Sequence, residues 1–179
     1  MTNDSNFTQD QLEKVGQLLI NSDRPLKERF RALFTLKNIG GKESIDWIAK
    51  AFNDESALLK HEVAYCLGQL QDPLAIPILT QVLSDSAREP IVRHEAAEAL
   101  AAIGGDAITE TLTKYAQDPV AEVRETCQLA LDMLEFRRNN KSAESNEYGS
   151  VDPAPASKEQ DIEKLKTDLL NTKLSLFER

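Results

Sequence analysis

Apolar side chains recur every three or four residues through most of the first 138 positions, which is the period of an amphipathic helix. One segment shows the pattern with Val123, Cys127, Ala130, Leu131 and Leu134. Polar stretches separate the apolar segments and are short enough to be turns. The pattern predicts a chain built from consecutive helices.

Proline and glycine indicate where these helices begin and end. Pro25, Pro73 and Pro90 each stand at the start of an apolar segment, where the N–H that proline lacks is not needed by the helix. Gly40 and Gly41 follow the segment that Pro25 opens, and glycine is common just after a helix ends. Together these signals predict helices arranged in four pairs.

The second helices of the four pairs share one sequence pattern. A leucine stands at the same place in each, at Leu36, Leu67, Leu100 and Leu131. Two-helix repeats of this length are typical of a HEAT-type α-solenoid, in which each repeat buries its apolar faces on its neighbours. We expect an all-α fold with a HEAT-repeat domain over residues 10–138. Its four repeats are expected at about 10–41, 42–72, 73–105 and 106–138.

The composition changes outside this domain. Residues 139–160 are polar and lack a helical apolar face, so we expect a flexible, disordered linker there. Residues 1–9 are expected to form a flexible N-terminus. Residues 161–179 are again amphipathic, and we expect a helix in them.

The final segment resembles the start of the chain at an offset of 150 residues. Glu178 and Arg179 follow Phe177 as Glu28 and Arg29 follow Lys27. We therefore expect the last helix to begin a second, truncated HEAT half.

The charge balance excludes some partners. The chain has 21 basic and 30 acidic residues and a net charge of -9, which argues against nucleic acid and anionic membranes. We see no signal peptide and no apolar run of the roughly 20 residues that a bilayer span needs. Cys66 and Cys127 lie in apolar helical segments, which predicts buried free thiols in a reducing compartment. We expect the cytoplasm, with the nucleus as a further compartment.

The two histidines of the chain occur in two matching dipeptides. His61 is followed by Glu62, and His94 by Glu95, 33 residues later. In the repeat alignment both dipeptides fall in the same place on the second helix. The corresponding places in the outer repeats hold Phe30, Arg31, Glu125 and Thr126.

This arrangement points to a metal site. Packed helices lie about 8–10 Å apart, so histidines at equivalent points of adjacent helices can bring their ring nitrogens to one ion. Two histidines and one carboxylate with open positions form the arrangement that binds ferrous iron for O₂ chemistry. A single His-Glu pair is more often a packed or surface feature, but two in register favour a metal. The candidate ligands are His61, Glu62, His94 and Glu95.

Other polar residues near these dipeptides have simpler interpretations. Glu98, one turn after His94, either orients a ligand or is a solvated charge. Tyr65 and Cys66 are expected in the core, without a ligand role.

Two arginines are expected to be structural. Arg93 and Arg124 share one repeat position, and we expect them to bond acidic turn residues such as Asp85 and Asp118.

Several segments together resemble the deoxyhypusine hydroxylase family. They are LKERFRALFTLKNIGG, KHEVAYCLGQ, VRHEAAEALAAIGG, VRETCQLALDML and, in the linker, SVDPAPA. The similarity covers the N-terminal half and linker of that family. Its members are HEAT-repeat proteins of two similar halves with four His-Glu motifs around a di-iron centre, and this chain holds two of the four.

The resemblance implies an iron-dependent monooxygenase that uses O₂ to hydroxylate the deoxyhypusine side chain of translation initiation factor 5A to hypusine. It implies that His61, His94 and Glu95 bind one Fe²⁺, one iron per half. Glu62 either binds the iron or contacts the amines of the substrate. Because two motifs are missing, we expect this chain to supply half of the site, to require the missing C-terminal half of the same protein, and to be inactive alone.

Two other functions fit the repeat pattern. One is a non-enzymatic HEAT scaffold that binds a protein partner on its concave face. The other is a protein similar to the phycobilin lyases, which act on a bilin chromophore and do not require paired His-Glu motifs. Bound iron would separate the oxygenase from the scaffold.

Overall fold

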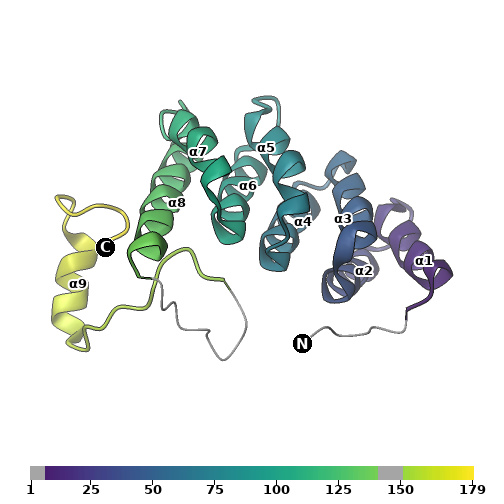
Figure 1. Ribbon diagram of the computed structural model, residues 1–179, viewed down its shortest axis with the longest axis horizontal. Coiled ribbons are helices and arrows are strands. Elements are labelled where there is room, and N and C mark those ends of the chain that lie inside the picture. The colour runs from purple at the N-terminus through teal and green to yellow at the C-terminus, as the bar shows by residue number, and fades with distance from the viewer. Residues whose placement is uncertain (1–6, 141–150) are drawn as a thin grey trace.

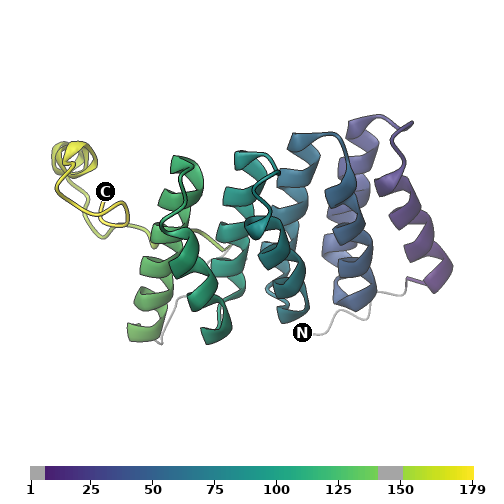
Figure 2. The same cartoon turned by 90° about the horizontal axis from the view of Figure 1, so that it is seen from above.

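Side-by-side helices make up most of the protein, in a computed structural model that describes residues 7–140 and 151–179. Figure 1 shows α1 to α8 as a curved row, with α9 beyond α8. Viewed from above in Figure 2, α1 to α8 stand roughly parallel, whereas α9 is seen nearly end-on. The bounds are α1 Gln9–Ile20, α2 Leu26–Ile39, α3 Gly41–Lys50, α4 Ala57–Leu70, α5 Ile76–Ser84, α6 Pro90–Ile103, α7 Thr109–Tyr115, α8 Ala121–Asn139 and α9 Ile162–Leu170.

The first eight helices form the four expected pairs, α1/α2, α3/α4, α5/α6 and α7/α8. The second helices of successive pairs also pack on one another, α2 on α4, α4 on α6 and α6 on α8. They form the inner layer of the solenoid. The predicted all-α solenoid of four helical pairs is confirmed.

Short 3₁₀ turns divide three of the predicted helical segments. Ala51–Asn53 follows α3, Pro73–Ala75 precedes α5 and Asp106–Ile108 precedes α7. At the second of these, the Asp72 side chain accepts the Leu74 N–H and closes a tight turn before α5 begins. The predicted segments are therefore correct in place, but α5 and α7 are shorter than the apolar pattern indicates.

The aligned leucines show where the core lies. Leu36, Leu67 and Leu100 are fully buried, while Leu131 on α8 is only partly buried. The helices of Leu36, Leu67 and Leu100 each have the next repeat packed against them. Complete burial of a leucine side chain stabilises a fold by about 1.5–3 kcal/mol. The lower burial of Leu131 marks α8 as the less covered end of the core.

Helices α4 and α6 approach each other closely. A Cβ added to Gly68 would stand only 2.7 Å from the Cα of Ala99, so no larger residue fits without a shift of backbone. Ala64, Ala96 and Ala97, also on these two helices, are fully buried. These small residues let the two helices approach closely.

Buried basic residues occupy one repeat position on the inner helices. Arg93 donates from Nε to the carbonyl of Leu83 at 3.0 Å and pairs with Asp118 at 2.6 Å. In the first repeat Arg29 makes the same two contacts, with Leu19 and Asp54. Such a residue joins the two helices of its own repeat to the turn of the next.

The expected arginine contacts are only partly as predicted. Arg93 does bind Asp118, whereas Arg124 donates to the main-chain carbonyl of Asp118 at 2.9 Å. Asp85 pairs instead with Arg88 in its own loop, at 3.3 Å. The charge of Asp85 is therefore paired within its own loop.

The segment after residue 150 repeats the geometry of the first turn of the chain. After α1, the side-chain oxygen of Asn21 accepts a hydrogen bond from the Asp23 N–H at 2.9 Å. After α9, the side-chain oxygen of Asn171 accepts one from the Lys173 N–H at 3.1 Å. The main-chain bonds match as well, because Arg179 donates to the Ser175 carbonyl as Arg29 does to that of Pro25. The offset of 150 residues seen in the sequence is thus also an offset in structure.

The burial of the two corresponding helices differs. Leu12 and Leu19 on α1 are 7% and 0% exposed. Their equivalents on α9, Ile162 and Leu169, are 76% and 60% exposed. Thus α9 has the sequence of a first repeat helix without the cover that α2 and α3 give to α1.

Some sequence predictions fall on parts of the chain that the structure describes only partly. The predicted flexible N-terminus and linker include residues 1–6 and 141–150, which lie outside the described residues. Residues 151–160 are described and form no helix. None of the described helices is long and apolar enough to cross a membrane. The proposed domain boundaries remain predictions.

Candidate metal centre

His61 and His94 face each other across the α4–α6 contact. Ser56 caps α4 by accepting the Leu59 N–H, and Pro90 opens α6, so both helices begin four residues before their histidine. The ring centroids are 5.7 Å apart and the rings are tilted by 44°. The repeat alignment therefore predicted correctly that the two side chains meet.

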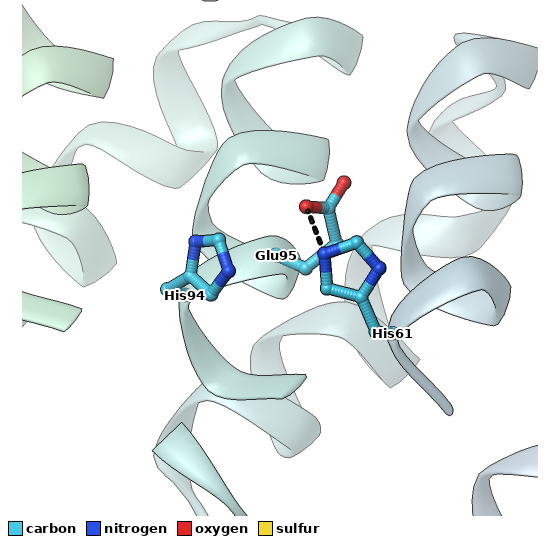
Figure 3. Close-up of side chains that lie close together, drawn as sticks. All are labelled: His61, His94 and Glu95. Atoms are coloured by element: carbon cyan, nitrogen blue, oxygen red, sulfur yellow. Dashed lines mark ion pairs between the residues drawn. The ribbon is translucent and has the colours of Figure 1, made fainter. Parts of the chain in front are cut away.

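A buried carboxylate lies against the histidine pair. Glu95 is 5% exposed, and its Oε2 lies 3.1 Å from Nε2 of His61. Figure 3 shows the carboxylate reaching from α6 toward the His61 ring, with His94 beside it. A carboxylate is rarely buried without a cationic or metal partner, because desolvation of the charge is unfavourable.

His61, His94 and Glu95 can each offer one ligand atom, and these atoms lie within 4.8 Å of one another. Atoms that each lie ~2.1 Å from one ion are at most ~4.2 Å apart, so a small rotation of the side chains would close the site. Two imidazoles and one carboxylate suit iron and other first-row divalent metals. The donor set thus fits an iron ion.

Glu62 lies on the other side of His61. Its Oε1 is 3.3 Å from Nδ1 of His61, and its side chain is about a quarter exposed. It is not in the group whose ligand atoms converge. A carboxylate on the second ring nitrogen of a histidine ligand fixes the tautomer and the ring orientation.

The pKa values of the two histidines are shifted in opposite directions. The hydrogen bond with Glu95 raises the pKa of His61, with further contributions from the charges of Glu95 and Glu62. Burial lowers the pKa of His94. When protonated, His61 can donate to a carboxylate from each ring nitrogen. The lowered pKa of His94 favours the neutral ring, which is the form that binds a metal.

Glu98 and Tyr65 lie one turn after His94 and His61 on the same helices. Both side chains are half-buried, and burial raises the pKa of the Glu98 carboxyl and of the Tyr65 hydroxyl. Glu98 is therefore not a fully solvated charge, and Tyr65 packs at the edge of the core.

Exposed apolar residues flank the centre on the side opposite to Glu98 and Tyr65. Leu58 and Ile91 each stand three residues before a histidine and are 55% and 46% exposed. They occupy the same repeat position on α4 and α6. Exposed apolar side chains therefore lie about one turn from each of the two histidines.

The cysteines do not contribute to the centre. Both are fully buried, and burial raises the pKa of the Cys66 and Cys127 thiols to about 12. Such thiols stay protonated at neutral pH and are poor ligands. Their predicted state as buried free thiols is confirmed.

One contact near the centre was not expected from the sequence. Gln69 on α4 binds the main chain of Val151, which lies 82 residues later. Residue spacing carries no signal for such a contact, because Val151 lies outside the repeats.

Comparison with known families agrees with the repeat fold. The family model for HEAT repeats matches residues 12–91. The model for the PBS lyase HEAT-like repeat matches residues 92–118. The matched residues include α4 and α6, which carry His61, His94 and Glu95.

The chain is also similar to curated proteins named deoxyhypusine hydroxylase. It is 56% identical over 174 residues to that of Drosophila pseudoobscura pseudoobscura, covering 96% of this chain and 58% of the relative. It is 55% identical over 170 residues to that of Danio rerio, covering 92% of this chain and 56% of the relative. The chain therefore spans less than three fifths of the length of these relatives.

A solved structure shows the same fold. Human deoxyhypusine hydroxylase in complex with glycerol matches with a TM-score of 0.91 and 51% sequence identity. The match covers 95% of this chain and 59% of the human one.

Proposed function

Because this HEAT-repeat chain is homologous to the deoxyhypusine hydroxylases over nearly its whole length, we propose that it supplies one iron-binding half of such an enzyme. The enzyme would hydroxylate the deoxyhypusine side chain of translation initiation factor 5A with O₂ and so form hypusine. Because the chain spans only part of its relatives, the reaction is assigned to the complete protein and not to residues 1–179 alone.

The convergence of His61, His94 and Glu95 is the observation that carries the proposal. The three side chains come from two adjacent repeats, and the same positions in the outer repeats lack histidine. Core packing does not require this set, because Phe30 fills the same place in the first repeat. A metal explains both the histidine pair and the buried carboxylate.

Iron held here would supply the activation of O₂ in the complete enzyme. His61, His94 and Glu95 would hold the ion. Leu58 and Ile91 would keep water from the site once a second surface covers them.

Glu62 has two possible roles in this proposal. As a partner of His61 Nδ1, at 3.3 Å, it would keep Nε2 free for the metal. Its partly exposed carboxylate could instead bind an amine of the deoxyhypusine side chain. We favour the substrate contact, because the Glu62 carboxylate is partly exposed and lies outside the group whose ligand atoms converge.

The other half of the site would come from a second HEAT array that begins with α9. This part of the proposal rests on the matching turns after Asn21 and Asn171 and on the exposed apolar residues of α9. A helix pair equivalent to α2 and α3 would bury Ile162 and Leu169, as α2 and α3 bury Leu12 and Leu19.

Anaerobic titration with Fe²⁺ tests the proposal directly. We expect one iron per chain, detected by metal analysis after gel filtration. His61→Ala and His94→Ala should each abolish this binding. A chain that binds no iron when it is folded would contradict the oxygenase and favour the scaffold function.

A further inference from the structure

Gln69 and Val151 form a two-point contact between the inner layer and the segment that leads to α9. The Val151 N–H donates to Oε1 of Gln69 at 3.0 Å, and Nε2 of Gln69 donates to the Val151 carbonyl at 3.1 Å. We propose that Gln69 is a positioning residue, which clamps Val151 and thereby fixes the C-terminal segment relative to the helix that carries His61.

The side-chain amide of glutamine suits this contact. A primary amide offers a donor and an acceptor side by side, and so it pairs with both polar groups of one residue as a neighbouring strand would. A glutamate lacks the donor and would place an oxygen against the Val151 carbonyl. A methionine has nearly the same shape and offers neither bond.

Gln69 lies on the same face of α4 as the metal centre. His61, Tyr65 and Gln69 are spaced by four residues, so they form one stripe along the helix. Eight residues of helix correspond to a rise of ~12 Å. The clamp and the candidate metal ligand are therefore held at a fixed separation by one rigid element.

The residues after the clamp lie against the next two inner helices. Val151, Asp152 and Pro153 line a pocket together with side chains of α6 and α8. The α6 and α8 side chains at the pocket include Ala101, Ala102 and Ala130, which are small and buried.

The clamp shortens the free chain before α9. With residues 151–153 held against the inner helices, the free segment that leads to α9 begins after Pro153. A shorter free segment restricts where α9 can lie. In the complete enzyme, and resting on the proposed function, this restriction would align the second half with the iron ligands of the first.

Hydrogen exchange at the Val151 amide tests the clamp in the chain itself. We expect this amide to be protected in the wild type, and its exchange to be about 10- to 100-fold faster in Gln69→Met and Gln69→Glu. Gln81→Met is the matched control, because Gln81 is exposed on α5 and should leave Val151 protected. Equal protection of Val151 in the wild type and in Gln69→Met would contradict the clamp.

A distance measurement tests the positioning. Glu43 on α3 and Lys166 on α9 are both exposed, so spin labels can be attached at Glu43→Cys and Lys166→Cys. The native cysteines are buried and should not be labelled. We expect a narrow distance distribution that broadens in Gln69→Met and remains narrow in Gln81→Met. An unchanged width in Gln69→Met would overturn the positioning role. Both readouts are independent of iron, so a failure to bind Fe²⁺ would contradict only the proposed function.

Discussion

Nε2 of His61, on α4, lies 3.1 Å from Oε2 of Glu95, on α6. The two residues belong to different repeats and to different dipeptides, because His61 stands beside Glu62 and Glu95 stands beside His94. The acid that meets His61 at the centre is thus the glutamate that follows the other histidine. This crossed pairing places Glu95, and not Glu62, in the group whose ligand atoms lie within 4.8 Å of one another.

Replacement of Glu95 should remove most of the metal affinity. We expect Glu95→Gln to weaken Fe²⁺ binding by more than about 100-fold, because loss of a partner outside the ligand set alone costs 10- to 100-fold. Glu125→Gln is a suitable control, since Glu125 is exposed and falls in the histidine position of the last repeat. Equal affinities of the two variants in an anaerobic titration would exclude Glu95 as a ligand.

The histidines should be dispensable for folding. We expect His61→Ala and His94→Ala to keep the helical circular dichroism of the wild type, because both side chains are only partly buried. Extensive unfolding of either variant would indicate a packing role instead.

Metal binding should depend on pH through His61. In the metal-free chain the hydrogen bond with Glu95 is the main cause that raises the pKa of His61. Only the neutral ring binds a metal. Affinity should therefore fall as the pH falls, starting at a higher pH than for an ordinary histidine. Fe²⁺ titrations across a pH series would show this, and an affinity independent of pH through the histidine range would refute it.

Gly68→Ala should separate α4 from α6. The added methyl group would stand 2.7 Å from the Cα of Ala99, and overpacking of this kind costs about 1–3 kcal/mol. This loss exceeds the gain of about 1 kcal/mol in helix propensity. We expect a lower urea midpoint and weaker Fe²⁺ binding, because both histidines are on these helices. A variant with wild-type affinity would show that the site tolerates the shift.

The pair of Arg93 and Asp118 should contribute to stability at neutral pH. The hydrogen bond from Arg93 lowers the pKa of Asp118, so the contribution is complete above the ordinary aspartate pKa and is lost as the pH falls through the lowered value. Because both side chains are buried, Asp118→Asn should destabilise the protein by about 3 kcal/mol at pH 7. The difference from wild type in urea unfolding should shrink in acid, and a constant difference would contradict the assignment.

The fold was predictable because its signals are local. The spacing of apolar residues and the positions of Pro25 and Pro90 predict where α2 and α6 begin, and the aligned leucines predict that the inner helices pack. The lengths of α5 and α7 were not predictable, since an apolar segment fits a 3₁₀ turn as well as an α-turn.

The candidate site was predictable as far as the repeat alignment extends. Equivalent positions on packed helices bring His61 and His94 together without further information. The sequence could not say which glutamate would converge, because that depends on which helix face each dipeptide presents to the other. The contact of Gln69 with Val151 lies outside the repeat, so no periodicity could indicate it.

The division of the ligands between α4 and α6 also affects how the solenoid unfolds. In a linear array each repeat is stabilised only by its neighbours, and such arrays can open one unit at a time. An ion bound by two adjacent repeats would bind only while both are folded, so its binding energy would be lost if either one opened. The metal would thus make the two central repeats a single cooperative unit, and heating would be expected to fray the array from its ends.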